Sequence, residues 1–303
     1  MELRHFRYFV HVAEELHFGR AAKRLGVSQP PLSQQIQVLE QKIGARLFER
    51  TNRRVELTEA GRLFLPEARA VLDQAAHAVA VARRASRGEI GEIAIGMTAS
   101  APFTGAVAKV IFTFRQRYPD VRLTMSEMPS PSQIEALTAG TLQAGLIRGA
   151  QLPHLPPGIT AAEIYSDRLV LALREDHPLA RSGAAITIDQ LADEPFVIHV
   201  RGMGAGFHEQ FLALCHRAGF EPKITQEVYE LSTLLGFIAA GLGITAVVGA
   251  LKALQVEHVV YRPLDAPDVV TKMWLVHNEK ETSPSCAAFI DLLIQHHKQP
   301  ADA

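Results

Sequence analysis

This 303-residue sequence lacks several features that would assign its class at once. It holds only two cysteines, Cys215 and Cys286, without CxxC spacing, so we expect reduced core thiols rather than disulfides or a metal site. No run of about eighteen apolar residues occurs, which argues against a membrane-spanning helix. The N-terminal stretch MELRHFRYF lacks the apolar core of a signal peptide. These absences predict a cytoplasmic protein that does not contact the membrane.

The usual signatures of catalysis are missing as well. There is no GxSxG nucleophile elbow and no cluster of His, Cys, Asp or Glu with metal-ligand spacing. Gly202, Gly204 and Gly206 resemble part of a dinucleotide-binding motif, but the third spacing is wrong. We therefore predict that the chain is not an enzyme, with no catalytic residue, no metal ligand and no cofactor.

Charge is distributed unevenly along the chain, although the net charge is only −1. Residues 1–87 hold fifteen basic and nine acidic residues, whereas the remainder holds sixteen basic and twenty-three acidic residues. A hydrophobic content of 48% and this length predict a globular protein of two or three domains. A basic head on an acidic body is typical of a nucleic-acid reader attached to a second domain.

The stretch from residue 18 to residue 43, FGRAAKRLGVSQPPLSQQIQVLEQKI, predicts two short helices joined by a tight turn. Gly26 suits the end of the first helix, and Ser28 is expected to cap the second. One face of the second helix is apolar, and the other carries short polar side chains suited to the edges of bases in a major groove. The residues predicted to contact DNA here are Ser28, Gln29, Pro30, Pro31, Ser33, Gln34 and Gln37.

Two amphipathic helices of any small bundle would show the same spacing, so the neighbouring segment decides the interpretation. Residues 46–58 form a turn-rich basic stretch after the second helix, which is the position of a wing. Residues 1–58 hold ten basic and six acidic residues, and such an excess provides contacts to phosphate. We predict that Arg53 and Arg54 contact DNA from this wing.

Residues 58–87 predict one long helix with a short heptad seam of small and apolar residues. Thr58 is placed to cap it. A single buried helix would show the same pattern. Pairing with a second copy is the better account, because the helix stands between two domains that offer it few neighbours.

From residue 90 onward, strands alternate with helices, which predicts a mostly parallel sheet. The expected strands lie at 91–96, 121–126, 144–147, 169–173, 196–199, 225–228 and 273–277, and the expected helices at 102–118, 132–139, 206–218, 231–240 and 285–297. The order indicates two lobes with two crossovers between them.

Ligands of open α/β sheets bind beyond the carboxyl ends of strands. This rule selects the loops that hold Ser100, Ser130 and Arg148 in the first lobe, and the segments 199–207 and 231–233 in the second. Ser100 alternatively only caps a helix. Arg148 needs a partner at the end of its apolar strand, either a structural carboxylate or a carboxylate of the ligand.

Three quoted stretches together resemble the N-terminal domain of LysR-type transcriptional regulators: LRHFRYF, FGRAAKRLGVSQPPLSQQIQVLE and LFERTNRRVELTEAG. The resemblance runs from residue 2 to about residue 65. It implies a winged helix-turn-helix domain at 1–58, a linker and dimerisation helix at 59–88, and a periplasmic-binding-protein-like effector domain at 89–303. Lobe I would span about 89–163 and 267–300, and lobe II about 164–266.

The resemblance also implies partners: an operator of double-stranded DNA, a small effector, a second copy through residues 58–87, a tetramer through the effector domains, and RNA polymerase. Residues 127–130 and Arg148 are similar to the branch that senses aromatic-pathway metabolites such as benzoate, muconate or phenylpropionate. On that basis Ser100, Ser130, Arg148 and Phe207 are expected to line the primary pocket. The strand-end rule adds His199 and Leu231 to the residues expected to contact a carboxylate effector. The chain departs from this family where Gln143 replaces the usual Asp, and where Gly249 replaces the proline usual in the branch.

These features predict a DNA-binding regulator switched by a small carboxylated metabolite. A solute-binding protein would explain residues 90–300 but not the basic head. An α/β enzyme fused to a DNA-binding module is the other alternative, and turnover of a bound metabolite would identify it.

Overall fold

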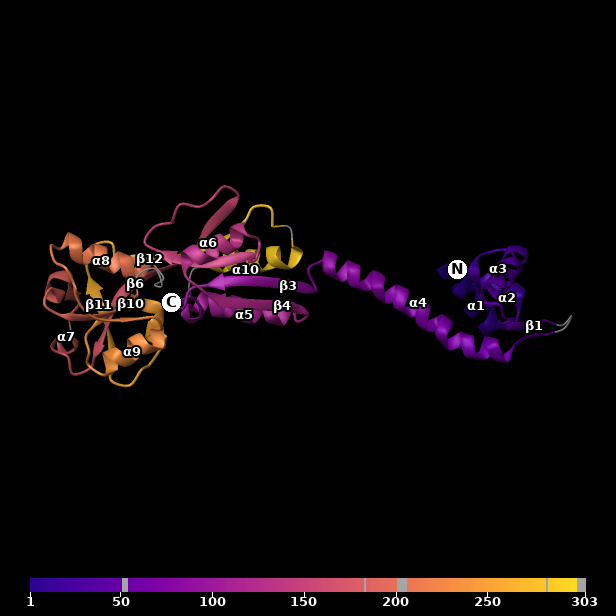
Figure 1. The fold of residues 1–303 in the computed structure, drawn as a ribbon, viewed down its shortest axis with the longest axis horizontal. Coiled ribbons are helices and arrows are strands. Elements are labelled where there is room, and N and C mark those ends of the chain that lie inside the picture. Colours follow the sequence, from indigo (N-terminus) through magenta and orange to yellow (C-terminus); the bar gives the residue numbers. More distant parts are fainter. Residues whose placement is uncertain (51–53, 183, 201–205, 282, 299–303) are drawn as a thin grey trace. The chain divides into compact units, whose positions relative to one another are not determined.

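The computed structural model describes residues 1–50, 54–182, 184–200, 206–281 and 283–298 (Figure 1). The chain divides into two compact units, Met1–Arg84 and Ala85–Ala303. Arg53, which we predicted to contact DNA, lies outside the described residues.

The first unit is a helix-turn-helix domain followed by a wing and a long helix. Its elements are α1 (Leu3–Glu15), α2 (Phe18–Leu25), α3 (Gln29–Ile43), β1 (Phe48–Arg50), β2 (Val55–Leu57) and α4 (Glu59–Ser86). The apolar stripe of α3, with Leu32, Ile36 and Leu39 fully buried, packs into one core with α1 and α2. Strands β1 and β2 pair antiparallel as the predicted wing. The polar face of α3 is therefore left on the outside.

The expected cap of α3 by Ser28 is wrong in one respect. Ser28 holds the N-cap position, but its hydroxyl makes no capping hydrogen bond. An N-cap oxygen normally accepts from the N–H group of the second or third helical residue, and both positions are prolines here. Pro30 and Pro31 therefore leave the Ser28 hydroxyl without a backbone donor, and it stays exposed.

Helix α4 has two different halves. At its start, the Gly61 N–H donates to the Thr58 hydroxyl over 2.9 Å, so the expected cap by Thr58 is confirmed. Ala68 is buried against the helix-turn-helix core, and Leu72 packs at its edge. Further along, Val79 is 51% exposed within the single chain. The second half thus carries apolar surface that its own domain does not cover.

The second unit is an α/β structure with its strands in the order β4-β3-β5-β12-β6-β11-β7, and with β10 also paired to β6. A separate parallel pair is formed by β8 and β9. The strands are β3 (Gly91–Met97), β4 (Val121–Glu127), β5 (Ala144–Gly149), β6 (Ile159–Arg174), β7 (Ile186–Thr187), β8 (Pro195–His199), β9 (Lys223–Val228), β10 (Thr245–Val248), β11 (Val259–Asp265) and β12 (Val270–Asn278). The helices are η1 (Ala101–Phe103), α5 (Gly105–Arg117), α6 (Ser130–Thr138), α7 (Pro178–Arg181), η2 (Ile188–Leu191), α8 (Phe207–Arg217), α9 (Leu231–Ala239), η3 (Gly249–Ala253) and α10 (Pro284–Lys298).

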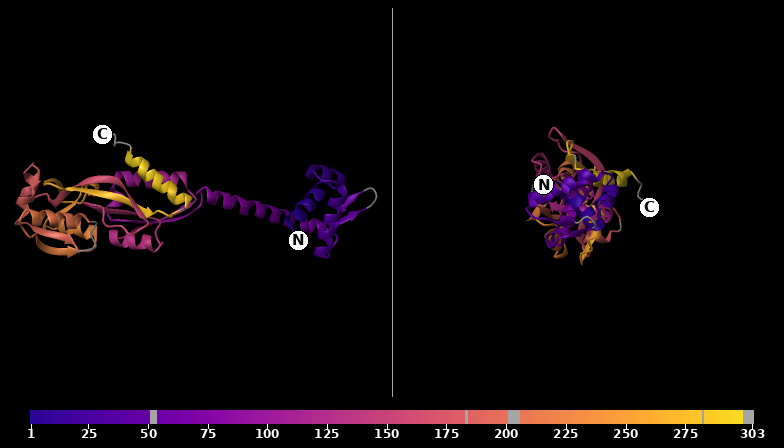
Figure 2. Two further views of the ribbon diagram at one scale, coloured as in Figure 1. Left: turned by 90° about the horizontal axis from the view of Figure 1, so that it is seen from above. Right: turned by 90° about the vertical axis from the view of Figure 1, so that its right-hand side faces the viewer.

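Strand β6 runs through both lobes of this unit. Its first part pairs with β12, and its last residues pair with β10 and β11. On the lobe I side, α5 and the C-terminal helix α10 pack together, with the rings of Phe114 and Phe289 5.2 Å apart (Figures 1 and 2). On the lobe II side, a second core gathers around Phe196 and Phe211. The two lobes are therefore continuous through the sheet, yet each has its own hydrophobic core.

The expectation of a mostly parallel sheet is wrong, because the sheet is mixed: β6 runs antiparallel to β10, β11 and β12, and β12 runs antiparallel to β5. Two expected elements also differ in the structure. The helix expected at 102–118 is divided at Thr104 into η1 and α5. The strand expected at 169–173 is only the end of β6, which begins ten residues earlier at Ile159. Within the part of the chain that the structure describes, no helix is long and apolar enough to cross a membrane.

Candidate functional site

The outer face of α3 presents most of the side chains that we predicted to contact DNA. Ser28, Gln29, Pro30, Pro31, Gln34 and Gln37 are exposed, and Ser33 is half-buried. They lie opposite the buried stripe, so the face is free of large apolar groups. Amide and hydroxyl groups on one helix face are suited to reading base edges in a major groove. The roles of the individual residues remain predictions.

A side-chain network, which was not predicted from the sequence, ties the wing to α3. Glu40 on α3 accepts hydrogen bonds from the backbone N–H groups of Leu47 and Phe48 at 2.8 and 3.1 Å. Arg50 on β1 donates to the other Glu40 carboxylate oxygen and to the Ser33 hydroxyl, both over 3.1 Å. The Arg50 guanidinium also lies over the Phe18 ring, 4.7 Å from its centroid. The planar fork of arginine thus fixes β1 against both helices of the motif.

At the far end of the wing, Arg54 is among the most exposed cations of the domain. Its side chain is 81% exposed, and its nearest guanidinium nitrogen lies 3.9 Å from a Glu56 carboxylate oxygen. An exposed pair at this distance contributes little and is readily exchanged for a phosphate. The position therefore suits the predicted contact to the DNA backbone.

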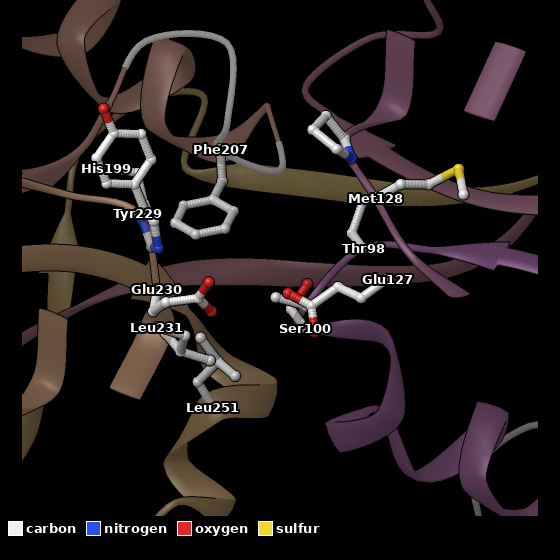
Figure 3. Close-up of a pocket in the computed structure, with 12 residues that line it drawn as sticks. Thr98, Ser100, Glu127, Met128, His199, Phe207, Tyr229, Glu230, Leu231 and Leu251 are labelled. Carbon is white, nitrogen blue, oxygen red and sulfur yellow. The ribbon is translucent and has the colours of Figure 1, made fainter. Parts of the chain in front are cut away.

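In the second unit, a cavity of about 360 Å³ lies between the two lobes (Figure 3). Its walls are Thr98, Ala99, Ser100, Glu127, Met128 and Pro129 from one lobe, and His199, Phe207, Tyr229, Glu230, Leu231 and Leu251 from the other. Of the residues predicted to bind the effector, Ser100, His199, Phe207 and Leu231 meet here. Ser130 and Arg148 are not part of the wall.

Hydroxyl groups on the lobe I side of the cavity are buried without partners. Thr98 and Ser100 are 2% and 1% exposed, and neither hydroxyl has a hydrogen-bond partner among the described residues. Ser100 therefore does not cap η1 through its side chain. The Ser130 hydroxyl is already engaged, because it accepts the backbone N–H of Arg148 over 3.3 Å. Buried unpaired hydroxyls are costly and are a common feature of ligand sites.

Arg148 lies buried at the end of β5, only 3% exposed. One guanidinium nitrogen, Nη2, donates to the Thr104 hydroxyl over 3.2 Å, whereas Nε and Nη1 have no partner among the described residues. Burial lowers the pKa of Arg148 to about 10, and the negative charge of Asp167 opposes that shift. The group therefore stays protonated at neutral pH. It supplies positive potential near the cavity without lining it.

Two histidines on the lobe II side are held in the neutral form. His199 is 6% exposed, and burial lowers its pKa, although the charge of Glu230 opposes the shift. Burial lowers the pKa of His208 to about 4, and the neighbouring His199 adds to this effect. The rings of the two histidines lie 6.5 Å apart. Near neutral pH His199 therefore brings no positive charge to the cavity wall, and His208 lies outside that wall.

Two residues that depart from family usage, Gln143 and Gly249, each fit a specific contact in the structure. The Gln143 side-chain oxygen accepts the backbone N–H of Ala94 over 2.8 Å, so an amide oxygen ties this turn to β3. At Gly249, a Cβ would lie 2.6 Å from a carboxylate oxygen of Asp167, whose other oxygen accepts the Ala250 N–H. The Asp167 carboxylate thus occupies the space that a larger residue at position 249 would need.

Other residues of the cavity were not named as site residues from the sequence. Thr98 and Glu127 lie in the loop before Ser100 and in the segment 127–130, which were selected as segments, whereas Tyr229 and Glu230 lie outside every predicted segment. Gln133 is fully buried and donates to the carbonyls of Met128 and Leu146, so it holds the loop before α6 against β5. In the sequence, Gln133 could have been recognised as an uncharged polar residue on the face of α6 that is expected to be buried. Among the residues described, no group of three or more His, Cys, Asp or Glu side chains is placed to hold a metal.

A basic winged helix-turn-helix joined to two α/β lobes around a polar cavity defines a DNA-binding regulator that responds to a small molecule. Comparison with known proteins agrees at both ends of the chain. Residues 3–62 match the bacterial regulatory helix-turn-helix family of the lysR type, and residues 86–298 match the LysR substrate binding domain. The chain therefore belongs to the LysR family of transcriptional regulators.

Its relatives are similar along their full lengths. The chain is 47% identical to the HTH-type transcriptional regulator YnfL of Escherichia coli, over 95% of this chain and 96% of that protein. It is 38% identical to AlsR of Bacillus subtilis, over 96% and 95%. The crystal structure of CbnR with its target DNA superposes with a TM-score of 0.85 at 28% identity, covering 98% of this chain and all of that one. These relatives are named regulators rather than enzymes, so the rival enzyme interpretation is not favoured.

Proposed function

We propose that this regulator binds its operator as a dimer through α3 and the wing, and that a small, partly apolar carboxylate bound between the lobes switches it. The observation that carries this proposal is the interlobe cavity, with the buried, unpaired hydroxyls of Thr98 and Ser100 facing the apolar side chains of Phe207 and Leu231. Hydroxyls on one wall and hydrocarbon on the other suit a molecule with one polar and one apolar end.

Several features favour a carboxylate at the polar end. The first residues of α8 and α9 line the cavity, as does the loop that leads into α6. Backbone N–H groups at helix starts attract anions. The buried charge of Arg148 adds positive potential from behind the wall. An aromatic or dienoic carboxylate, as the branch resemblance implies, has the matching combination of groups.

A molecule that binds between the two lobes can change their relative arrangement and thereby regulate the protein. The walls of the cavity come from both lobes, so a ligand that contacts both favours one arrangement over another. Only a difference in affinity between the two arrangements changes their populations. We infer that this change alters how the paired effector domains present the DNA-binding domains.

The partners of the regulator follow from its surfaces. The uncovered apolar residues of α4 favour pairing with a second copy, and a two-fold dimer requires a two-fold-related operator. The family resemblance further supports a tetramer and contact with RNA polymerase. We place the protein in the cytoplasm, where its operator lies.

Calorimetry with the full chain tests the chemistry of the effector. The panel holds aromatic acids, dienoic diacids and the corresponding amides. We expect acids to bind at least tenfold more tightly than their amides, because a charge-assisted hydrogen bond is lost in the amide. Equal affinity for an acid and its amide would contradict the proposed carboxylate site.

A further inference from the structure

The two lobes place opposed carboxylates across the cavity. Glu127 ends β4 in one lobe, and Glu230 precedes α9 in the other. Both line the cavity, and Figure 3 shows their carboxylate groups pointing toward one another from the two sides. Two like charges that face each other repel, and the repulsion grows as the lobes approach.

No described residue of the chain neutralises this pair. Neither glutamate forms an ion pair with a residue that the structure describes. Neutral His199 cannot act as the cation, because burial keeps its pKa low. Arg148 lies behind the wall rather than on it. The described part of the cavity surface therefore carries two negative charges and no positive one.

Both walls of the cavity also hold buried polar groups without hydrogen-bond partners among the described residues. Thr98, Ser100 and His199 are each more than nine-tenths buried, and each has a side-chain polar atom without a hydrogen-bond partner among the described residues. All three line the cavity. Buried polar atoms of this kind indicate that a ligand, rather than bulk water, completes their hydrogen bonds.

We propose that the effector carries a protonated amine, held between Glu127 and Glu230, in addition to its carboxylate. This inference rests on the proposed function, because it assigns a second group to the same ligand. An ammonium group donates up to three hydrogen bonds, and two opposed carboxylates accept them from either side. The effector is thus an amino acid or a related amino carboxylate with an apolar side chain.

Two other partners for the Glu127 and Glu230 carboxylates, a metal ion and a neutral polyol, match the cavity less well than an amine does. A bound metal ion needs more ligands than this pair, and the described residues contain no group of three that would hold one. A neutral polyol would donate hydrogen bonds but leave both negative charges in place on closure. An amine is the simplest group that places a positive charge between the two carboxylates, offsets their repulsion and bridges the lobes.

Matched pairs of probes test this inference by calorimetry with the full-length chain. Phenylalanine is compared with 3-phenylpropionate, and leucine with 4-methylpentanoate, so that each pair differs only in the amine. We expect the amine-bearing member of at least one pair to bind roughly tenfold more tightly. This preference should fall toward one in the double variant Glu127→Gln/Glu230→Gln. It should persist in Glu135→Gln/Glu227→Gln, which removes one exposed carboxylate from each lobe outside this cavity.

Two results would overturn the inference. The first is equal or tighter binding of the amine-free acid in both pairs. The second is a preference for the amine that survives in the Glu127→Gln/Glu230→Gln variant. The proposed function is judged separately, because it requires the amine-free acids to bind and to lose affinity in Ser100→Ala.

Discussion

At the residue scale, the side-chain hydroxyls at the starts of α3 and α4 differ in whether they cap the helix. Thr58 caps α4, whereas the hydroxyl of Ser28 is left without a backbone donor by Pro30 and Pro31. We expect Thr58→Ala to cost about 1 kcal/mol of stability, as is usual for a lost cap. Ser28→Ala should cost less than about 0.5 kcal/mol and instead weaken operator binding. Urea unfolding of both variants, monitored by hydrogen exchange of the core amides of the first unit, measures the two losses of stability. A loss of stability in Ser28→Ala as large as in Thr58→Ala would show that this hydroxyl caps α3 after all.

Arg50 and Arg54 are both wing arginines, yet we expect them to act differently on DNA binding. Arg50 uses its guanidinium within the domain, on Ser33 and Glu40, so Arg50→Lys keeps the charge but loses the fork. Affinity should fall roughly tenfold with no change in its salt dependence. Arg54→Ala should instead reduce the slope of log affinity against log salt by about one, because a phosphate contact is lost. Fluorescence anisotropy across a salt series measures both. A reduced slope in Arg50→Lys would mean that Arg50 itself contacts phosphate.

His208 predicts a pH dependence of stability for the effector domain. Its pKa is lowered from 6.5 to about 4 by burial. As pH falls from about 6.5 toward 4, the unfolded chain binds a proton that the folded chain rejects, so stability decreases. The loss amounts to roughly 3 kcal/mol if the whole shift is expressed. His208→Gln should flatten the pH profile in this range, and thermal unfolding from pH 7.5 to pH 4.5 checks it. A profile identical to that of the unchanged chain would contradict the assignment.

The candidate site could be predicted from the sequence only in part, residue by residue. The strand-end rule located the loops that hold Ser100, His199 and Leu231, and these residues do line one cavity. The rule says which edge of the sheet a residue occupies but not which way its side chain points. Arg148 therefore turned out to lie behind the wall. Glu127 and Glu230 were not predicted to line it, because an exposed glutamate at the end of an element is ordinary in any sequence.

At the scale of elements, α4 provides a direct test of self-association. Val79 lies on the predicted seam and is half-exposed in the single chain, whereas Leu72 also packs against its own domain. Val79→Glu therefore disturbs pairing without disturbing the core. We expect sedimentation to show monomers of this variant at concentrations where the unchanged chain is a dimer.

Val81→Glu is the matched control for that substitution. It places the same charge on the same helix, but two residues further on and roughly on the opposite side, since successive helical residues turn by about 100°. Val81→Glu should therefore remain a dimer. An unchanged chain that sediments as a monomer at micromolar concentration would rule out pairing through α4.

Elements with strong periodicity were predicted well, and those that depend on distant partners were not. Helix α3 shows its apolar stripe in the sequence, and its bounds follow from that stripe and from the flanking Ser28 and Gly44. The first half of β6 has no such pattern, because ITAAEIYSDR mixes small, charged and apolar residues. That half is a strand because β12 pairs with it from more than one hundred residues away. Such long-range pairing leaves little trace in a local sequence pattern.

At the scale of the whole molecule, Gly206 lies in close contact with the other lobe at the start of α8. It has a φ of 73°, and a Cβ there would meet the backbone of Arg148 and Gly149 in the other lobe. The start of α8, which lines the cavity, is therefore in contact with the end of β5. This contact connects the occupancy of the cavity with the relative arrangement of the lobes, which is the link that regulation of DNA binding requires.

One measurement tests the central claim most directly: DNase footprinting of the full chain on its operator while a carboxylate from the panel is titrated in. We predict that a carboxylate which binds between the lobes changes the length or the affinity of the footprint. In Thr98→Ala/Ser100→Ala the effect of the ligand should require at least tenfold more of it, because the buried hydroxyls that receive the carboxylate are gone. A footprint that no carboxylate alters, or one that responds equally in the unchanged chain and in this variant, would contradict the account.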